Sequence, residues 1–273
     1  MNSLSEANTH FAVDLFQQLR KSEKDNIFYS PLSISSALAM TYLGAQGDTA
    51  LQIGKMFTDL AVAGVAEEAE QVLHFNDVTD STRGTATTAH NNRKIKNLFP
   101  DHSLDFAILV LVNAVYFKGQ WNKEFNKEYT VEEKFWLTKL EDKLTAEKLI
   151  EWTSSQNMSE KKVELHLPRF KVEESYKLND TLKCMGMVDA FSPQDANFLG
   201  MAERRDLVLT IIVHKSFVEV NEEGTEAAAA TGIGTGVTSA PIYESFHCDH
   251  PFLFFIKHIK TNSILFLGRV SSP

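Results

Sequence analysis

The sequence predicts a single α+β domain in which helices pack around a central antiparallel or mixed β-sheet. Helical hydrophobic patterns dominate the N-terminal part, long β-type runs follow from Ala107 onward, and no internal repeat or interdomain linker interrupts the 273 residues. Hydrophobic residues make up 43% of the chain and include 19 Phe, which is enough for one sizeable core. We therefore expect residues 1–273 to form one domain.

The chain opens with a helix pattern that leads into a short strand. Ser3 and Glu6 form a capping box ahead of apolar residues at helical spacing, which predicts an amphipathic helix ending near Lys21. The apolar run Asn26–Tyr29 then predicts a short strand.

Two further helices are expected after this strand. Ser30 supplies a helix cap and Pro31 a first-turn proline for a helix that is apolar on most sides and ends at Gly44. Such a helix belongs in the centre of the fold. Thr49 and Gln52 form a second capping box, which predicts that another helix begins at Thr49.

The strongest strand patterns begin at Ala107 and continue to the C-terminal part of the chain. The near-continuous β-type run Ala107–Phe117 is typical of a strand buried on both faces. Val163–Leu167 alternates strictly, as does the stretch around Phe170, so two strands are expected to meet at Pro168. Leu207–Val220 predicts one long strand.

The remaining segments are assigned more coarsely. Leu144–Met158 is a helix candidate, and Thr79–Asn92 has the composition of an exposed loop. Phe252–Ile256 and Ile264–Leu267 predict a C-terminal hairpin that turns at Lys260–Ser263.

Composition restricts the partners and the compartment. The formal net charge of -9 and a pI near 5.5 argue against nucleic acid or an anionic membrane as the main partner. The N-terminus shows no signal-peptide pattern, and no apolar run is long enough to span a membrane. Cys184 and Cys248 make neither a disulfide framework nor a metal quartet, so free thiols in the cytoplasm are expected, with no metal and no cofactor.

The segment Glu222–Thr231 is the most specific feature of the sequence. One interpretation is a helix, because Ala and Glu are both good helix formers. A second is a phosphate loop at Gly232–Gly236, which is weak because no strand leads directly into these glycines and no helix follows them. A third is a loop that can enter a sheet as a strand.

The third interpretation explains the order of the side chains. In a strand, alternate residues point to opposite faces. One face would hold only small, uncharged residues, namely Thr225, Ala227, Ala229 and Thr231. The other face would hold the one charge, in the set Glu226, Ala228 and Ala230. The pattern therefore tolerates both an exposed loop and an inserted strand, and it lacks proline, which would remove a ladder hydrogen bond.

Four segments in the right order carry a family resemblance. Glu222–Thr231 resembles the serpin hinge, and Phe246–Phe252 with the apolar residues that follow resembles the serpin C-terminal signature. Asn26–Ser33 is similar to a serpin strand-to-helix junction, and Leu111–Trp121 to a strand of the serpin central sheet. The chain is identified as a member of the intracellular, ovalbumin-type serpins, similar to the squamous cell carcinoma antigen branch.

The resemblance implies a serpin-like fold with a central mixed sheet, packed helices and an exposed reactive loop at about 222–245. It also implies a protease inhibitor, not an enzyme, that forms an acyl-enzyme with its target and traps it as the cut loop inserts into the central sheet. The implied hinge residues are Glu222, Gly224, Thr225, Glu226, Ala227, Ala228, Ala229, Ala230 and Thr231.

Family spacing from the hinge places the attacked bond near Thr238–Ser239, with Val237 before it. No Arg or Lys lies between Thr231 and Pro241, which argues against a trypsin-like target. Papain-like cysteine proteases and chymotrypsin- or elastase-like serine proteases both remain as expected partners.

The resemblance also implies residues that control opening of the sheet. Ser30, Ser33, Asn113 and His214 match a cluster beneath the sheet centre, in which His214 hydrogen-bonds Asn113. Trp121, Arg169 and Glu222 match residues where the loop first enters, the last two as a salt bridge. Without the resemblance, a satisfied core histidine, a plain helix cap and a core Trp are the simpler interpretations.

The chain departs from the family in length. Part of the fold is expected to be missing between Asn92 and Ile95 and near Leu137–Leu144, and Phe57–Gln71 resembles an insertion. The alternative function is therefore a non-inhibitory, shortened binding protein or protease substrate. A hydrolase is the weakest hypothesis, because the G-x-S-x-G and H-E-x-x-H motifs are both absent. We expect a monomer in the cytoplasm, with unconventional secretion to the extracellular space.

Overall fold

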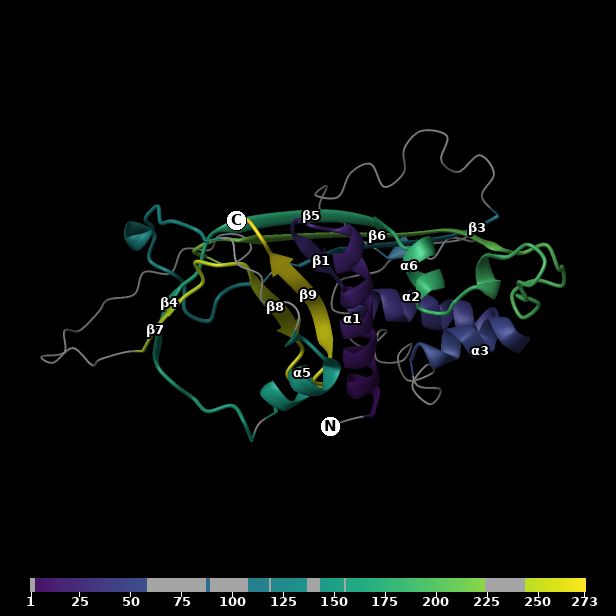
Figure 1. Cartoon of the computed structure of the whole chain (residues 1–273), viewed down its shortest axis with the longest axis horizontal. Coiled ribbons are helices and arrows are strands. Elements are labelled where there is room, and N and C mark those ends of the chain that lie inside the picture. The colour runs from purple at the N-terminus through teal and green to yellow at the C-terminus, as the bar shows by residue number, and fades with distance from the viewer. Residues whose placement is uncertain are drawn as a thin grey trace, which may run out of the picture.

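The computed structural model describes residues 3–57, 87–88, 108–117, 119–136, 143–154, 156–223 and 244–273, and these residues form an α+β fold (Figure 1). The elements in chain order are α1 (Ser3–Ser22), β1 (Ile27–Tyr29), α2 (Pro31–Gly44), α3 (Gly47–Lys55), β2 (Thr87–Thr88), β3 (Leu109–Tyr116), the 3-10 helix η1 (Lys127–Tyr129), α5 (Ala146–Trp152), β4 (Val163–His166), β5 (Phe170–Lys177), α6 (Asn179–Cys184), the 3-10 helix η3 (Asp189–Phe191), β6 (Leu209–Val220), β7 (Glu244–His247), β8 (Phe252–Lys257) and β9 (Ile264–Val270).

The central sheet is mixed, as the sequence predicts. Its strand order is β2-β3-β6-β5, in which β3 runs parallel to β6 and β5 runs antiparallel to β6. The first strand corrects the expectation of a loop over Thr79–Asn92, because Thr87 and Thr88 pair in parallel with β3. Loop-like composition did not reveal this strand because the edge of β3 supplies its hydrogen-bond partners.

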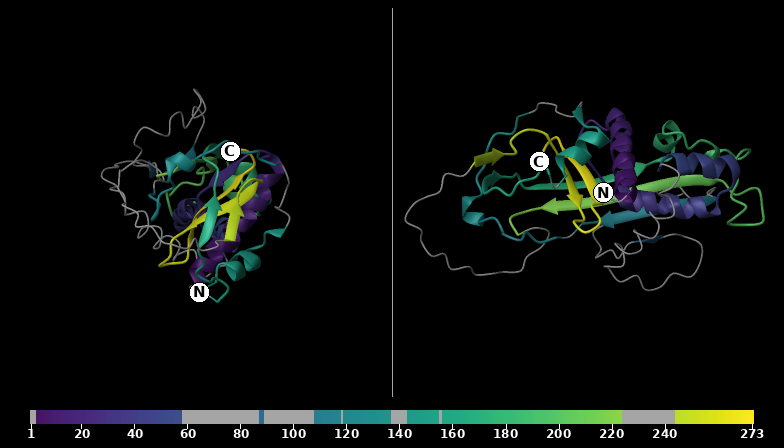
Figure 2. Two further views of the ribbon diagram at one scale, coloured as in Figure 1. Left: turned by 90° about the vertical axis from the view of Figure 1, so that its left-hand side faces the viewer. Right: turned by 90° about the horizontal axis from the view of Figure 1, so that it is seen from below.

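Two smaller sheets complete the described architecture. The order β1-β9-β8 is antiparallel throughout and contains the predicted C-terminal hairpin, and β4 pairs with β7 in parallel. Helices α1, α2 and α3 lie on one side of the long central strands, and β4 and β7 lie at the end of the molecule away from α3 (Figures 1 and 2). The two-stranded sheet is thus separated from the helical layer.

Local capping chemistry fixes several helix ends as predicted. The Ser30 side chain accepts a hydrogen bond from the Ser33 N–H, and a proline occupies the first turn of α2. Most of α2 is buried, as its apolar sequence predicts. The helix expected over Leu144–Met158 is shorter, and Thr145 caps α5 by accepting from the Lys148 N–H.

The capping box predicted at Thr49 is wrong. Helix α3 begins two residues earlier, at Gly47, and its N-cap residue makes no side-chain capping bond. The Thr49 hydroxyl accepts instead from the Asn197 N–H at 3.0 Å, and Gln52 Oε1 accepts from Val188 N–H at 2.8 Å. Both side chains satisfy backbone donors of a distant segment, so tertiary partners replace the local cap.

Aromatic packing joins the β1-β9-β8 sheet to the central sheet. Phe117, which directly follows β3, meets Phe266 of β9 edge-on with ring centroids 5.5 Å apart. Phe170 of β5 packs against Phe254 of β8 at 5.4 Å. These contacts hold the β1-β9-β8 sheet against the central sheet. The fully buried Phe28 ring of β1, which stacks on Phe266 at 5.1 Å, contributes roughly 1.5–3 kcal/mol to the same core.

The described helices include none with the length and apolar character needed to cross a membrane. Cys184 is exposed and Cys248 is half-buried, and both are free thiols, as the sequence predicts.

Candidate functional site

The centre of the site is the junction between the parallel strands β3 and β6. Asn113 of β3 and His214 of β6 are paired in the register of the sheet. Both residues are buried, and no part of His214 is exposed. A hydrogen-bonded polar pair in this position links the two strands through side chains as well as through the backbone ladder.

A chain of hydrogen bonds fixes the tautomer of His214. The Ser30 backbone N–H donates to His214 Nε2 at 3.1 Å, so Nε2 acts as the acceptor. His214 Nδ1 lies 2.7 Å from Asn113 Oδ1 and therefore carries the ring proton. The neutral imidazole uses both of its nitrogens.

Asn113 and Ser30 extend the same network into the helical layer. Asn113 Nδ2 donates to the Ser33 carbonyl oxygen at 2.9 Å and to Ser33 Oγ at 2.6 Å. The Ser30 hydroxyl donates to the Leu265 carbonyl oxygen of β9 at 2.7 Å. The cluster of Ser30, Ser33, Asn113 and His214, which we name the central cluster, therefore connects β3, β6, β9 and the start of α2.

Burial keeps His214 neutral. The loss of hydration lowers the pKa of His214 to about 3, far below its ordinary value near 6.5. The Tyr176 ring is nearly parallel to the imidazole, with centroids 6.5 Å apart, and Ser30 N–H occupies the nitrogen that a second proton would need. The hydroxyl and imidazole groups of the central cluster are buried and already hydrogen-bonded to one another and to the backbone. They therefore connect the strands and are not available for proton transfer.

A second group of predicted residues lies at the end of β6. Trp121 Nε1 donates to the Asn221 carbonyl oxygen at 2.9 Å, and its ring meets Phe125 edge-on at 5.5 Å. Arg169 Nε lies 3.7 Å from Glu222 Oε2, with Arg169 largely exposed and Glu222 buried. The structure thus brings together Trp121, Arg169 and Glu222 as the sequence predicts.

Sequence reasoning missed the segment that holds Glu222 from the other side. The Thr130 hydroxyl donates to Glu222 Oε1 at 2.8 Å, the Phe125 N–H donates to the Glu222 carbonyl at 2.9 Å, and Lys127 pairs with Glu223. Hydrogen bonds from its own backbone N–H and from Thr130 lower the pKa of Glu222. These contacts span about ninety residues, so no local pattern reveals them.

The other predicted positions fall outside the described residues. This applies to the hinge positions Gly224–Thr231 and to the reactive-bond positions Val237, Thr238 and Ser239. The described chain stops at Glu223 and resumes at Glu244 with β7. The end of β6 and the start of β7 therefore mark the two ends of the predicted loop.

The comparison with protein families decides the identity. The family Serpin, described as serine protease inhibitor, matches residues 6–90, 85–141 and 137–273. The chain belongs to the serpin family. Among curated relatives, human Serpin B3 is 42% identical over 407 residues, and mouse leukocyte elastase inhibitor A is 36% identical over 384 residues; each alignment covers all of both chains.

This serpin is shortened internally. Its 273 residues are aligned over 407 positions with Serpin B3 from end to end, so part of the relative's sequence has no counterpart. The predicted family and the predicted ovalbumin-type clade are both confirmed.

Solved structures confirm the fold. Uncleaved ovalbumin has a TM-score of 0.85 at 29% identity, covering 99% of this chain and 100% of the other. Maspin has a TM-score of 0.83 at 23% identity, covering 100% of this chain and 99% of the other, and supports the fold alone. The serpin architecture therefore persists in a chain that lacks part of it.

Proposed function

We propose that this serpin inhibits a protease by trapping it after cleavage of the reactive loop, which then inserts into the central sheet. The observation that carries the proposal is the direct, parallel pairing of β3 with β6. Strand β6 also leads straight into the predicted loop, so one end of the loop is anchored beside the strand pair it would enter.

Strand direction favours insertion at this junction. A segment that folds back from the C-terminal end of β6 runs antiparallel to β6. Because β3 is parallel to β6, the same segment is antiparallel to both strands and can form a ladder on each side. Insertion breaks the one ladder between β3 and β6 and forms two new ones, and this net gain of one ladder supplies the driving force.

The central cluster controls the opening that insertion requires. Separation of β3 from β6 must break the bond between His214 and Asn113, which measures 2.7 Å. A buried polar group that loses its partner costs about 1–3 kcal/mol, so the cluster holds the strands together until the inserted strand offsets this cost. The simpler interpretation of a satisfied core histidine describes the same contacts before insertion.

The loop sequence sets the class of target. The interval between Thr231 and Pro241 contains no cation, and the attacked bond is proposed at Thr238–Ser239 with Val237 before it. Papain-like cysteine proteases and chymotrypsin- or elastase-like serine proteases fit such a loop. The name of the similar mouse protein, leukocyte elastase inhibitor A, supports an elastase-like member of this set.

Incubation with a panel of these proteases tests the proposal. The expected result on a denaturing gel is a covalent complex that contains both proteins. Release of cleaved serpin, with no complex at any ratio of protease to serpin, would contradict it. Mass spectrometry of the released C-terminal peptide would locate the attacked bond.

A matched pair of hinge variants tests insertion itself. Ala227→Arg places a cation on the face of small residues, whereas Ala228→Arg places it on the face that also carries Glu226. We expect Ala227→Arg to be cleaved without forming the complex and Ala228→Arg to retain most of the complex. Equal yields from both variants would contradict the proposed orientation.

The shortened chain supports a second candidate function, a non-inhibitory binding protein or protease substrate. Strand β8 is one of the two outer strands of the β1-β9-β8 sheet in the described part of the chain, and an outer strand presents unpaired backbone groups to a partner. Loop cleavage distinguishes the candidates: a rise in Tm after cleavage supports insertion, and an unchanged Tm supports the second candidate.

The same proposal includes a single domain over residues 1–273 that works as a monomer. The cytoplasmic location, with unconventional secretion to the extracellular space, stays a prediction from the sequence. Fractionation of cells that express the tagged chain measures it directly.

A further inference from the structure

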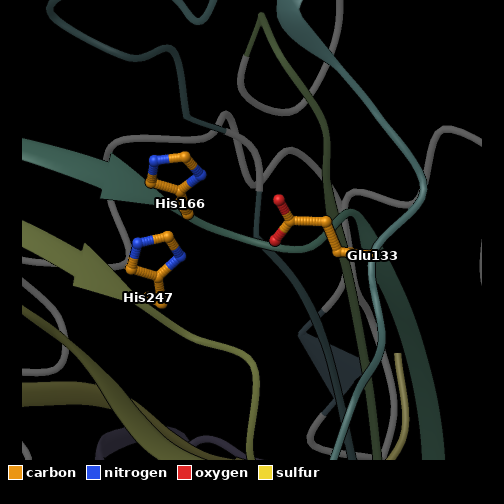
Figure 3. A group of neighbouring side chains, drawn as sticks. All are labelled: Glu133, His166 and His247. Carbon is orange, nitrogen blue, oxygen red and sulfur yellow. The ribbon is translucent and has the colours of Figure 1, made fainter.

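A cluster of three potential metal ligands lies on the small β4–β7 sheet. Glu133, His166 and His247 place one ligand atom each within 4.8 Å of one another, and all three side chains are exposed (Figure 3). The cluster lies outside the central cluster and outside the contacts at Glu222. Nothing in the proposed trapping mechanism uses these side chains.

The parallel register of the sheet creates the histidine pair. His166 of β4 and His247 of β7 are direct partners in the register, so their side chains leave the same face side by side. The two rings stack with centroids 4.0 Å apart and planes inclined by 17°. Two imidazoles are therefore held together by backbone pairing, although 81 residues separate them in the chain, from 166 to 247.

The third ligand comes from a segment anchored beside β7. The Trp136 N–H donates to the Asp249 carbonyl oxygen at 2.7 Å, which holds residues 131–136 next to the end of β7. Figure 3 shows the Glu133 carboxylate pointing toward the two rings. In each ring, the nitrogen nearer the backbone attachment faces this carboxylate (Figure 3).

The outward-facing nitrogens have oxygen partners of their own. His247 Nε2 lies 2.9 Å from Ser245 Oγ, and His166 Nε2 lies 3.7 Å from Glu164 Oε1. Glu164 and Ser245 precede the histidines by two residues and are themselves paired in the register, so they share the same face. At His247 this resembles the arrangement of metal-binding histidines, in which an oxygen orients the ring through its second nitrogen; at His166 the Glu164 carboxylate lies on the same side of the ring, beyond hydrogen-bond distance.

We propose that Glu133, His166 and His247 bind Zn²⁺, with the fourth position open to water or to a partner group. Two imidazoles and a carboxylate suit zinc, which accepts nitrogen ligands at about 2.0–2.1 Å and carboxylate oxygen at a similar distance. Tetrahedral ligands at that distance lie about 3.3 Å apart, so the three side chains approach one another by rotation on binding. Their exposure permits that rotation.

Zinc binding would tie three segments into one unit. A two-stranded sheet alone is marginally stable in water, and every side chain of β7 is exposed. A bound ion linking β4, β7 and residues 131–136 would stabilise β7 through its last residue, His247. On the proposed function this is the C-terminal anchor of the reactive loop, so zinc would fix that end while the hinge end stays free to insert.

Calorimetric titration of the metal-free full chain with Zn²⁺ tests the site without any protease. We expect one site that weakens at least about tenfold in His166→Ala, in His247→Ala and in Glu133→Gln. His250→Ala is the matched control, because His250 is exposed, pairs with Asp249 and lies outside the cluster. A Zn²⁺ affinity equal to that of the wild type in all four variants would overturn the proposal.

Chemical modification then locates the ion. Zn²⁺ should protect His166 and His247 from diethyl pyrocarbonate, as read by mass spectrometry, and leave His250 reactive. Protection of other histidines alone would contradict the assignment even if the chain binds zinc. Because neither measurement uses loop cleavage, failure of the zinc site and failure of the inhibitory function are separately visible.

Discussion

Two histidine sites of this serpin use the same side chain in opposite ways. His214 is fully buried at the β3–β6 junction and both of its nitrogens are hydrogen-bonded within the fold. His166 and His247 are exposed on the β4–β7 sheet and share a face with carboxylates. In both sites, parallel strands align two polar side chains in register.

The difference lies in burial. In the central sheet, the loss of hydration disfavours the charged form of the His214 imidazole. His214 therefore stays neutral and only makes hydrogen bonds to its neighbours. On the small sheet, water surrounds the rings and an ion can reach them. The same register therefore produces a buried, fully hydrogen-bonded pair in one region and an exposed pair of imidazoles in the other.

The largest expected effect is a pH dependence that belongs to His214. Its pKa of about 3 in the fold lies below the unfolded value near 6.5, so the unfolded chain binds the extra proton first. The stability from neutral His214 is complete above pH ~6.5 and falls by up to about 1.4 kcal/mol per pH unit as the pH drops toward 3.

Denaturant unfolding of the wild type and of His214→Gln between pH 4 and 8 would measure this dependence, because the range covers most of the interval between the two pKa values and a plateau above it. The free-energy difference between them should shrink as the pH falls. A difference that stays constant over the whole range would show that His214 is not neutral and buried in solution.

Removal of the partner of His214 should have the next largest effect. Asn113→Ala leaves the His214 ring proton and the Ser33 carbonyl without their bonds, at an expected cost of about 2–3 kcal/mol in the free energy of unfolding. The matched variant on the exposed sheet, His166→Ala without metal, should change it by no more than about 0.5 kcal/mol. If chemical denaturation gave the same loss in the free energy of unfolding for both variants, the proposed difference between the buried and the exposed site would be wrong.

Glu174 of β5 should show the opposite pH trend to His214. Burial, followed by the neighbouring charges of Glu23 and Asp25, raises the pKa of this half-buried carboxyl to about 7. The protonated form therefore favours the fold below the ordinary value near 4.5, and this contribution is lost as the pH rises toward 7. Glu174→Gln should gain stability over the wild type through that window, and solvent exposure keeps the gain small.

The smallest effects are expected at Glu222. The exposed Arg169 lies 3.7 Å from Glu222, so Arg169→Ala should cost less than about 1 kcal/mol. Thr130→Val removes a 2.8 Å hydrogen bond to the same carboxylate and should cost more, about 1 kcal/mol. A double-mutant cycle of Arg169→Ala and Thr130→Val, measured at low and high salt, compares the free energy of unfolding that each substitution removes. A larger loss from Arg169→Ala than from Thr130→Val would contradict this prediction.

The sequence correctly predicted helix starts and turns that depend only on residues close together in the chain. Ser30 and the proline after it begin α2 as expected, and the hairpin β8–β9 turns where the polar residues indicate. Thr49 shows the limit of this approach, because a distant N–H at Asn197 uses its hydroxyl. A capping pattern in the sequence identifies a side chain that can accept a hydrogen bond. Which N–H group donates to it depends on the tertiary fold.

Some residues of the candidate sites could likewise be predicted from the sequence, whereas others could be found only in the structure. The resemblance named Asn113, His214, Trp121 and Arg169. The described structure contains the expected His214–Asn113 bond and Arg169–Glu222 pair, and it places Trp121 against Asn221. Thr130 at Glu222 and the pair His166–His247 could not be found in this way, because their partners lie 81 to 92 residues away. Only strand register and the path of residues 119–136 bring them together.

By itself the sequence determined the family, the α+β class and the small-residue segment that makes an inserting loop plausible, since these depend on composition and short-range order. The tertiary structure decided which polar side chains meet and whether water reaches them. Burial and strand register are properties of the assembled sheets, so the buried His214–Asn113 pair and the exposed His166–His247 pair exist only in the fold.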